Sequence, residues 1–266
     1  MLKSINLKKP IVFIDLETTG IRYYADRIVE FSVLKVQPDG TEEYKSRRVN
    51  PEMPIPAGAT NVHGISDTDI EGEPTFRQLA KGIYEFIDNC HLSGFNILDF
   101  DLPLLESEFR RVGVEFSRAN RQIIDTMTIY HKMVPYDSNA SRNLVAAYLF
   151  YCGKGLKDAH SADNDVKACA EVLGGQLDMY DDLPRDVNSL CSICSEGREN
   201  YIDPVGKFVW LENEASFNFG QHKGRLLREI ADEHPDYLGW ILGQDFSPKV
   251  LEIITNALKG EFPDWY

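Results

Sequence analysis

Apolar and polar positions along the first two thirds of the chain follow the spacing of strands in some segments and of helices in others. Strand-like apolar runs occupy residues 11–15 and 28–36, and a third candidate strand follows at 41–49. Gln37-Pro38-Asp39-Gly40 has the composition of a turn, so we expect these strands to pair as a meander.

Helical spacing alternates with short strands after a Pro- and Gly-rich loop expected at residues 50–72. We expect helices at 74–88, 101–112, 141–149 and 162–180, with strands at 91–96 and 122–124. This alternation predicts an α/β domain with a mixed sheet flanked by helices. A boundary near 181–186 would separate a domain at 8–182 from a smaller, mostly helical α+β domain at 190–266.

Charge and cysteine content restrict the classes of function. The chain of 266 residues has a net charge of −14, which argues against broad, non-specific binding of duplex nucleic acid. No apolar run reaches the length of about 20 residues that a membrane span needs, and the first ten residues lack a signal-peptide pattern, so we expect a cytoplasmic protein. Five cysteines indicate free thiols, and Cys191 and Cys194 lack the second pair that a zinc ribbon requires.

The first candidate for chemistry lies at the end of the first predicted strand. Asp15 and Glu17 are two residues apart, so a strand directs both carboxylates to one face. Neighbouring acids repel unless a cation lies between them, and hard oxygen ligands suit Mg²⁺ or Mn²⁺. The alternative is a strand that ends in two ordinary solvated acids before a turn.

Two later segments offer further acids. Asp101 opens a predicted helix after Phe100, where the helix dipole alone would favour an acid, and Asp99 is a rival. His160 precedes another predicted helix, and Asp165 follows it five residues later. Asp163 lies closer to the histidine and can be read as a helix-start acid.

Together these motifs resemble the DEDDh (DnaQ-like) 3′–5′ exonucleases. The resemblance covers about residues 10–180 and rests on Phe13-Ile14-Asp15-Leu16-Glu17-Thr18-Thr19-Gly20, on the Asn96 to Asp101 motif, and on the five-residue spacing from His160 to Asp165. Relatives that use a tyrosine in place of the histidine would need Tyr at 161, which is Ser161 here. The resemblance implies an RNase H-like fold.

The same resemblance implies a two-metal site and a set of residue roles. Two Mg²⁺ or Mn²⁺ ions would be bridged by Asp15 and held by Glu17, Asp101 and Asp165, while His160 acts as the general base. The product would be a nucleoside 5′-monophosphate. Contacts to the terminal nucleotide are expected from the following residues: Thr18, Thr19, Gly20, Ile21 or a neighbour, Asn96 and Phe100.

Smaller motifs carry structural expectations. His63, in Asn61-Val62-His63-Gly64-Ile65, is expected to be structural, and Asp125 is expected to cap a helix rather than bind metal. Residues from Phe217 onward resemble the C-terminal domain of exonuclease X-like proteins. There Lys223 and Arg225 are candidates for phosphate contacts, with an ordinary surface position as the alternative. Tyr237 and Trp240 are expected in the domain core, with base stacking as the alternative.

The expected partner is a nucleic-acid 3′ end, with single-stranded DNA as the first substrate to test. No membrane partner is expected, and a homodimer is left open. The alternative function is a catalytically silent module on the same scaffold that binds nucleic acid or a protein partner. Loss of one of the acids would indicate that alternative, and all of them are present.

Overall fold

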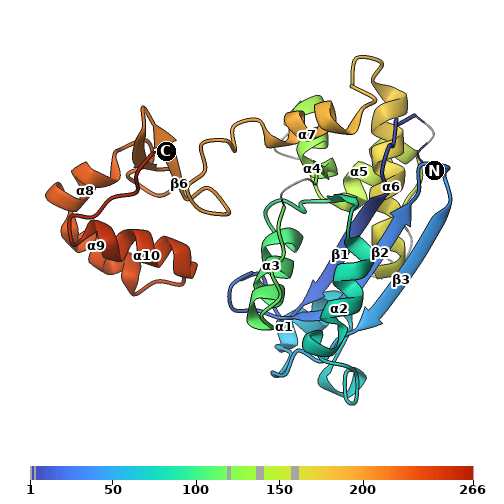
Figure 1. Ribbon diagram of the computed structural model, residues 1–266, viewed down its shortest axis with the longest axis horizontal. Helices are drawn as coiled ribbons and strands as arrows, with labels where there is room; N and C mark the ends of the chain where they lie inside the picture. The colour runs from blue at the N-terminus through green and yellow to red at the C-terminus, as the bar shows by residue number, and fades with distance from the viewer. Residues whose placement is uncertain (1, 3, 119–120, 136–140, 157–161, 266) are drawn as a thin grey trace. The chain divides into compact units, whose positions relative to one another are not determined.

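The chain folds into two compact units, Met1–Cys194 and Ser195–Tyr266, and each is considered by itself. Figure 1 shows the computed structural model, which describes all residues except 1, 3, 119–120, 136–140, 157–161 and 266. The division lies beyond the boundary expected near 181–186. The reason is that α7 (Val187–Ser195) buries Val187, Leu190 and Cys194 in the core of the first unit.

A mixed five-stranded sheet forms the centre of the first unit, in the order β3-β2-β1-β4-β5. The strands are β1 (Ile11–Thr18), β2 (Ile28–Val36), β3 (Glu42–Arg48), β4 (His91–Gly94) and β5 (Ile123–Asp125). The first three pair antiparallel, which confirms the predicted meander, and β4 and β5 continue the sheet in parallel. The predicted α/β domain with a mixed sheet is therefore confirmed.

Helices cover both faces of this sheet. They are α1 (Ala57–His63), α2 (Phe76–Ile87), α3 (Asp101–Arg111), α4 (Thr126–Met133), α5 (Leu144–Cys152), α6 (Ala162–Met179) and α7, with a short 3₁₀ helix at Asp67–Asp69. Within the described part of the chain, no helix is both long and apolar enough to cross a membrane. The expected loop at 50–72 contains α1, which has no buried residue and hence no apolar periodicity to reveal it.

Strand register assigns each side chain of β1 to one of two faces. Asp15 and Glu17 lie opposite Ser32 and Glu30 of β2 on one face, whereas Ile14 and Leu16 point to the other. Helix α6 brings Asp165 to the acidic face. Helix α2 lies over the opposite face (Figure 1), and it packs against α3 through Phe76 and Phe109, whose ring centroids are 5.2 Å apart.

At the edge strand β5, cysteine thiols accept backbone hydrogen bonds in place of a neighbouring strand. The N–H groups of Ile123 and Asp125 donate to the sulfurs of Cys191 (3.4 Å) and Cys194 (3.3 Å) on α7. All five cysteines are free, as predicted. The C-x-x-C pair thus satisfies backbone donors at an edge that would otherwise be open to pairing with another chain.

The second unit packs three helices against a small hairpin. Its elements are β6 (Phe208–Leu211), β7 (Glu214–Phe217), α8 (Leu227–Glu233), α9 (Pro235–Leu242) and α10 (Pro248–Ala257). Phe208, Phe217 and Ile241 are fully buried in its core. Tyr237 packs against this core, as expected. The prediction that Trp240 lies in the core is wrong, because Trp240 is 56% exposed on α9.

Asp125 caps α4 as expected and also organises the loop that leads to α3. Its buried carboxylate accepts hydrogen bonds from the N–H groups of Met127 and Thr128 in the helix and of Asn96 and Leu98 in the loop. Asn96 has a φ of 66°, a left-handed conformation that is uncommon for a residue other than glycine. One side chain therefore holds the strained backbone that precedes Asp101.

Loss of the Asp125 carboxylate should lower the stability of the first unit. Asp125→Ala leaves several buried N–H donors without an acceptor, so the free energy of unfolding should fall by about 2–4 kcal/mol. Asp186→Ala is the matched control, because exposed Asp186 accepts from the N–H of Ser189 in α7, and an N-cap is worth about 1 kcal/mol. Urea unfolding measures both losses, and equal losses would contradict the special role of Asp125.

Candidate active site

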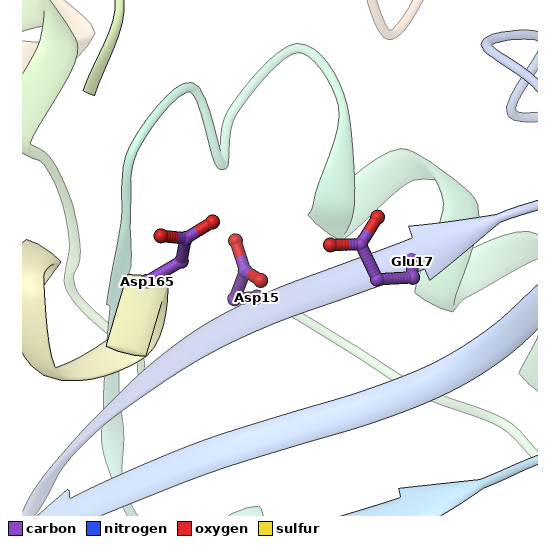
Figure 2. Close-up of side chains that lie close together, drawn as sticks. All are labelled: Asp15, Glu17 and Asp165. Carbon is purple, nitrogen blue, oxygen red and sulfur yellow. The ribbon is translucent and has the colours of Figure 1, made fainter. Parts of the chain in front are cut away.

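Three carboxylates converge at the end of β1. One ligand oxygen each from Asp15, Glu17 and Asp165 lies within 4.8 Å of the other two. Figure 2 shows Asp15 and Glu17 projecting from β1 on the side of α6, and Asp165 at the first turns of α6 facing Asp15. Asp165 is buried, whereas the two strand acids are partly exposed, so the cluster remains open to a ligand.

Asp101 reaches the same place from the start of α3. Its Oδ1 accepts a hydrogen bond from the N–H of Leu16 at 3.1 Å. That N–H is available because β4 pairs with β1 only as far as Phe13 opposite Ser93. The buried carboxyl of Asp101 has a pKa well above its ordinary value, because burial and the charge of Asp15 both disfavour ionisation. The rival Asp99 lies in the partly exposed segment just before the helix.

One further acid was missed from the sequence. Glu30 lies directly opposite Glu17 in the register of β1 and β2, and its charge raises the pKa of both Asp15 and Glu17. The only sequence signal was a single charged residue near the start of the apolar run at 28–36. Its meaning depends on strand register, which fixes which residues face each other across a pair.

Crowding changes the ionisation of the strand acids. Burial, with repulsion from Asp165 and Glu30, raises the pKa of Asp15 to about 7. Burial and the charges of Asp15, Asp165 and Glu30 raise the pKa of Glu17 to about 8. A divalent cation among these oxygens would oppose both effects, and carboxylate oxygens are the ligands that Mg²⁺ and Mn²⁺ prefer. The donor set therefore fits such an ion.

The turn after β1 holds most of the expected substrate contacts. The hydroxyl of Thr18 donates to the carbonyl of Gly20 at 2.6 Å, and that of buried Thr19 accepts from the N–H of Arg27 at 3.0 Å. A side chain at Gly20 would collide with Asp26, since a Cβ there would lie 2.6 Å from its Oδ2. Ile21 is 85% exposed, so it is the apolar group of this turn that a ligand can contact.

The remaining residues predicted from the sequence are two substrate contacts and two histidines. Asn96 and Phe100 are both half-buried in the loop before α3. His160, the expected general base, lies outside the described residues. His63 accepts from the N–H of Ile65 at Nδ1 (3.0 Å), so its Nε2 donates to the carbonyl of Thr18 at 3.2 Å. This contact ties α1 to the end of β1, in agreement with a structural role.

An ion-pair group fixes the helix that carries Asp101. Glu108 of α3 is fully buried and accepts from the side chain of Arg27 at 2.7 Å and from the N–H of Ile28 at 3.2 Å. Arg111 lies 3.3 Å from the same carboxylate. Because Glu108 lies two helical turns after Asp101, this group anchors α3 against the start of β2 and holds Asp101 in place.

The fold and its acidic site define the RNase H-like class, in which a mixed sheet carries carboxylates at the end of its central strand. The chain belongs to the RNase_T exonuclease family, whose model, described as "Exonuclease", matches residues 12–173. A second model, "Exodeoxyribonuclease X-like C-terminal", matches residues 217–246. The predicted family resemblance is confirmed for both parts of the chain.

Individual relatives agree with this assignment. The chain is 28% identical to a DNA polymerase III PolC-type of Clostridium perfringens over 162 residues, and 25% identical to the 3′-5′ exonuclease DinG of Staphylococcus aureus over 173 residues. These matches cover 61% and 65% of this chain but span only 11% and 19% of the relatives. E. coli exonuclease I in complex with a dT13 oligonucleotide matches in fold, with a TM-score of 0.56, 18% identity, and coverage of 64% of this chain and 41% of that one.

The raised pKa values predict how stability depends on pH without divalent cations. Asp15 and Glu17 titrate near 7 and 8 in the folded state but near 3.8 and 4.5 when unfolded, so between these values the folded state binds more protons. The free energy of unfolding should therefore fall as the pH rises from about 4 to about 8. In Asp15→Asn this fall should be shallower, and the variant should be more stable than the wild type at about pH 8.

Urea unfolding in EDTA across this pH range provides the measurement. Glu71→Gln, at an exposed position remote in sequence from the cluster, is the control and should follow the wild type. Excess Mg²⁺ should restore the stability of the wild type at the higher pH. Parallel curves for Asp15→Asn and the wild type in EDTA would show that the carboxylates do not repel each other as described.

Proposed function

We propose that this chain is a metal-dependent 3′–5′ exonuclease that releases nucleoside 5′-monophosphates from the 3′ ends of single-stranded DNA. The observation that carries the proposal is the convergence of Asp15, Glu17 and Asp165 within 4.8 Å, with Asp101 anchored beside them. The polarity is supported by the DinG relative, which is named a 3′-5′ exonuclease. Single-stranded DNA is supported by the exonuclease I structures with dT13 and dA16 oligonucleotides.

The four acids would divide two Mg²⁺ or Mn²⁺ ions between them. Asp15 lies between Glu17 and Asp165 (Figure 2) and would contact both ions. Glu17 and Asp165 would complete one site, and Asp101 would serve the second, directly or through water. When bound, such ions supply Lewis-acid activation of a water molecule and neutralise charge on the phosphate and the leaving oxygen.

Other residues of the chain would move the proton and orient the substrate. His160 would accept the proton of the attacking water at an imidazole nitrogen, since its ordinary pKa of about 6.5 suits a base at neutral pH. Exposed Ile21 would press on the terminal base, with Thr18, Thr19 and Gly20 shaping the turn beneath it. Asn96 and Phe100 would line the other side, next to Asp101.

Single substitutions of the acids should separate catalysis from folding. Asp15→Asn and Asp165→Asn should each abolish mononucleotide release from a 3′-labelled oligonucleotide with Mg²⁺ present, because each removes a charged ligand from the site. Asp99→Asn is the matched control and should retain wild-type activity. Circular dichroism should show unchanged folds. Full activity in either site variant would refute the assignment, and an inactive wild type would favour a silent binding module.

The general base should affect turnover and leave metal binding intact. His160→Ala should lower kcat by about 10²–10⁴-fold, the range that general base catalysis contributes. Mn²⁺ affinity, measured by isothermal titration calorimetry, should match that of the wild type. A wild-type kcat at neutral pH would remove His160 from the mechanism.

We assign the second unit a role in substrate engagement. Trp240 is exposed and stacks on Tyr237 with ring centroids 5.7 Å apart, so one aromatic face is available to a base. Of the two cations considered for phosphate contacts, Lys223 is exposed. Arg225 forms ion pairs with Glu233 (2.8 Å) and Glu229 (3.2 Å). Because both pairs are exposed and contribute little, a phosphate would compete with these two carboxylates for Arg225.

Removing the exposed indole should weaken substrate binding and leave chemistry intact. Trp240→Ala should raise KM for an oligonucleotide by about fivefold or more with unchanged kcat, since stacking contributes about 1–3 kcal/mol per base. Leu211→Ala, at an exposed apolar position on β6, is the control. An unchanged KM would point to a protein-binding role for this unit. A truncated chain that lacks the second unit must keep α7. A chain that ends at Leu183 would lose the α7 side chains that are buried in the core of the first unit.

A further inference from the structure

A groove of about 270 Å³ lies on the sheet face opposite the acids, between α2 and β3. Its floor is apolar and combines Phe31 and Val33 of β2 with Leu79, Ile83 and Phe86 of α2. Phe31 and Val33 are buried, whereas Leu79 and Phe86 are only half-buried, so the groove presents apolar surface to solvent. A small apolar hollow bordered by charged side chains can hold an apolar group of a ligand and orient it through the charges at its rim.

Basic side chains line the open side of this groove. Lys45 and Arg47 of β3 form its outer wall, and both are exposed. The ammonium groups of Lys35 and Lys45 lie over the ring of Phe86, at 4.0 and 4.3 Å from its centroid. Glu43 lies 2.9 Å from Lys45 in an exposed pair, which contributes little and which a ligand carboxylate can replace. In a chain with a net charge of −14, this concentration of cations selects an acidic ligand.

A glycine keeps the groove open. Gly82 lines it from the interior of α2, where glycine is unfavourable for a helix. Apart from its chain neighbours and the backbone of its own helix, no atom lies within 4 Å of the place a Cβ would occupy. The helix therefore forgoes a better helix former at a position where a larger side chain would fill the groove.

The kind of ligand follows from the groove's surface. A nucleobase binds best on an open aromatic face, but the ring of Phe86 already lies beneath two ammonium groups. The apolar surface that remains is largely aliphatic, which suits a leucine, isoleucine or phenylalanine side chain. Carboxylates flanking such a side chain would meet Lys45 and Arg47.

We propose that this groove binds a short acidic segment of a partner protein, which inserts a bulky apolar side chain between α2 and β3. The site lies apart from the acidic cluster, because Val33 and Phe31 alternate along β2 with Ser32 and Glu30, which face Asp15 and Glu17. The two faces share the strands but no side chains. The proposal therefore stands whether or not the chain has exonuclease activity.

Selection of random peptides displayed on phage, against the full chain in EDTA, provides an unbiased probe. The enriched peptides should combine Asp or Glu with Leu, Ile or Phe. A fluorescein-labelled copy of the strongest peptide is then titrated by fluorescence polarisation. Charge reversal in Lys45→Glu with Arg47→Glu should weaken its affinity by about tenfold or more. Gly82→Leu should do the same by filling the groove, whereas Gly82→Ala should bind nearly as the wild type does.

The matched control reverses the same number of charges elsewhere on α2. Arg77→Glu with Lys81→Glu changes two exposed cations outside the groove and should leave affinity within about twofold. No enrichment, enrichment of basic peptides, or equal affinity in the groove and control variants would overturn the proposal. The proposal would also be overturned if the wild type bound no peptide and the Lys45/Arg47 variant lost binding to oligo(dT). That result would show that the groove binds nucleic acid.

Discussion

Repulsion among the carboxyl groups at the end of β1 is the constraint on which the first unit depends. Asp15, Glu17, Asp101 and Asp165 come from one strand and two helices, and Glu30 adds a fifth charge from β2. In the absence of cations, the charges of these acids raise one another's pKa values and oppose the cluster. Contacts outside the cluster oppose this repulsion at Asp101, namely its hydrogen bond from Leu16 and the buried ion pair of Arg27 with Glu108 that anchors α3.

This arrangement gives the site its chemical character. Groups with pKa values of about 7 and 8 keep protons at neutral pH that ordinary carboxyls lose, so the cation-free site is only partly charged. Binding of a divalent cation must release those protons, which couples metal affinity to pH. The hydrogen bond from Leu16 and the ion pair of Arg27 with Glu108 hold Asp101 in place, and a donor held in this way needs less rearrangement to bind a cation.

The sequence predicted the parts of this structure that local spacing controls. Asp15 and Glu17 share a face because strands have a period of two, and the meander followed from its apolar runs and turn. Glu30 was missed because its role depends on register, and α1 was missed because it buries nothing. Trp240 was misjudged, and the ion pairs of Arg225 were not predicted, because exposure and ion pairing depend on tertiary contacts that span several elements. The C-x-x-C pair was recognised, but its part in covering β5 needed the packing of α7.

Successive side chains of a strand point to opposite faces of the sheet, and β2 uses both of its faces. Along β2, Glu30 and Ser32 face the acids while Phe31 and Val33 floor the groove, so adjacent residues serve opposite faces. A substitution on one face changes neither the charge nor the shape of the other, provided the backbone pairing is kept. The register of β1 with β2 positions Glu17 against Glu30, and the register of β2 with β3 positions Val33 against Lys45. A slip of β2 by one residue would exchange its two faces. Because β2, the strand shared by both pairings, is buried over most of its length, such a slip is strongly disfavoured.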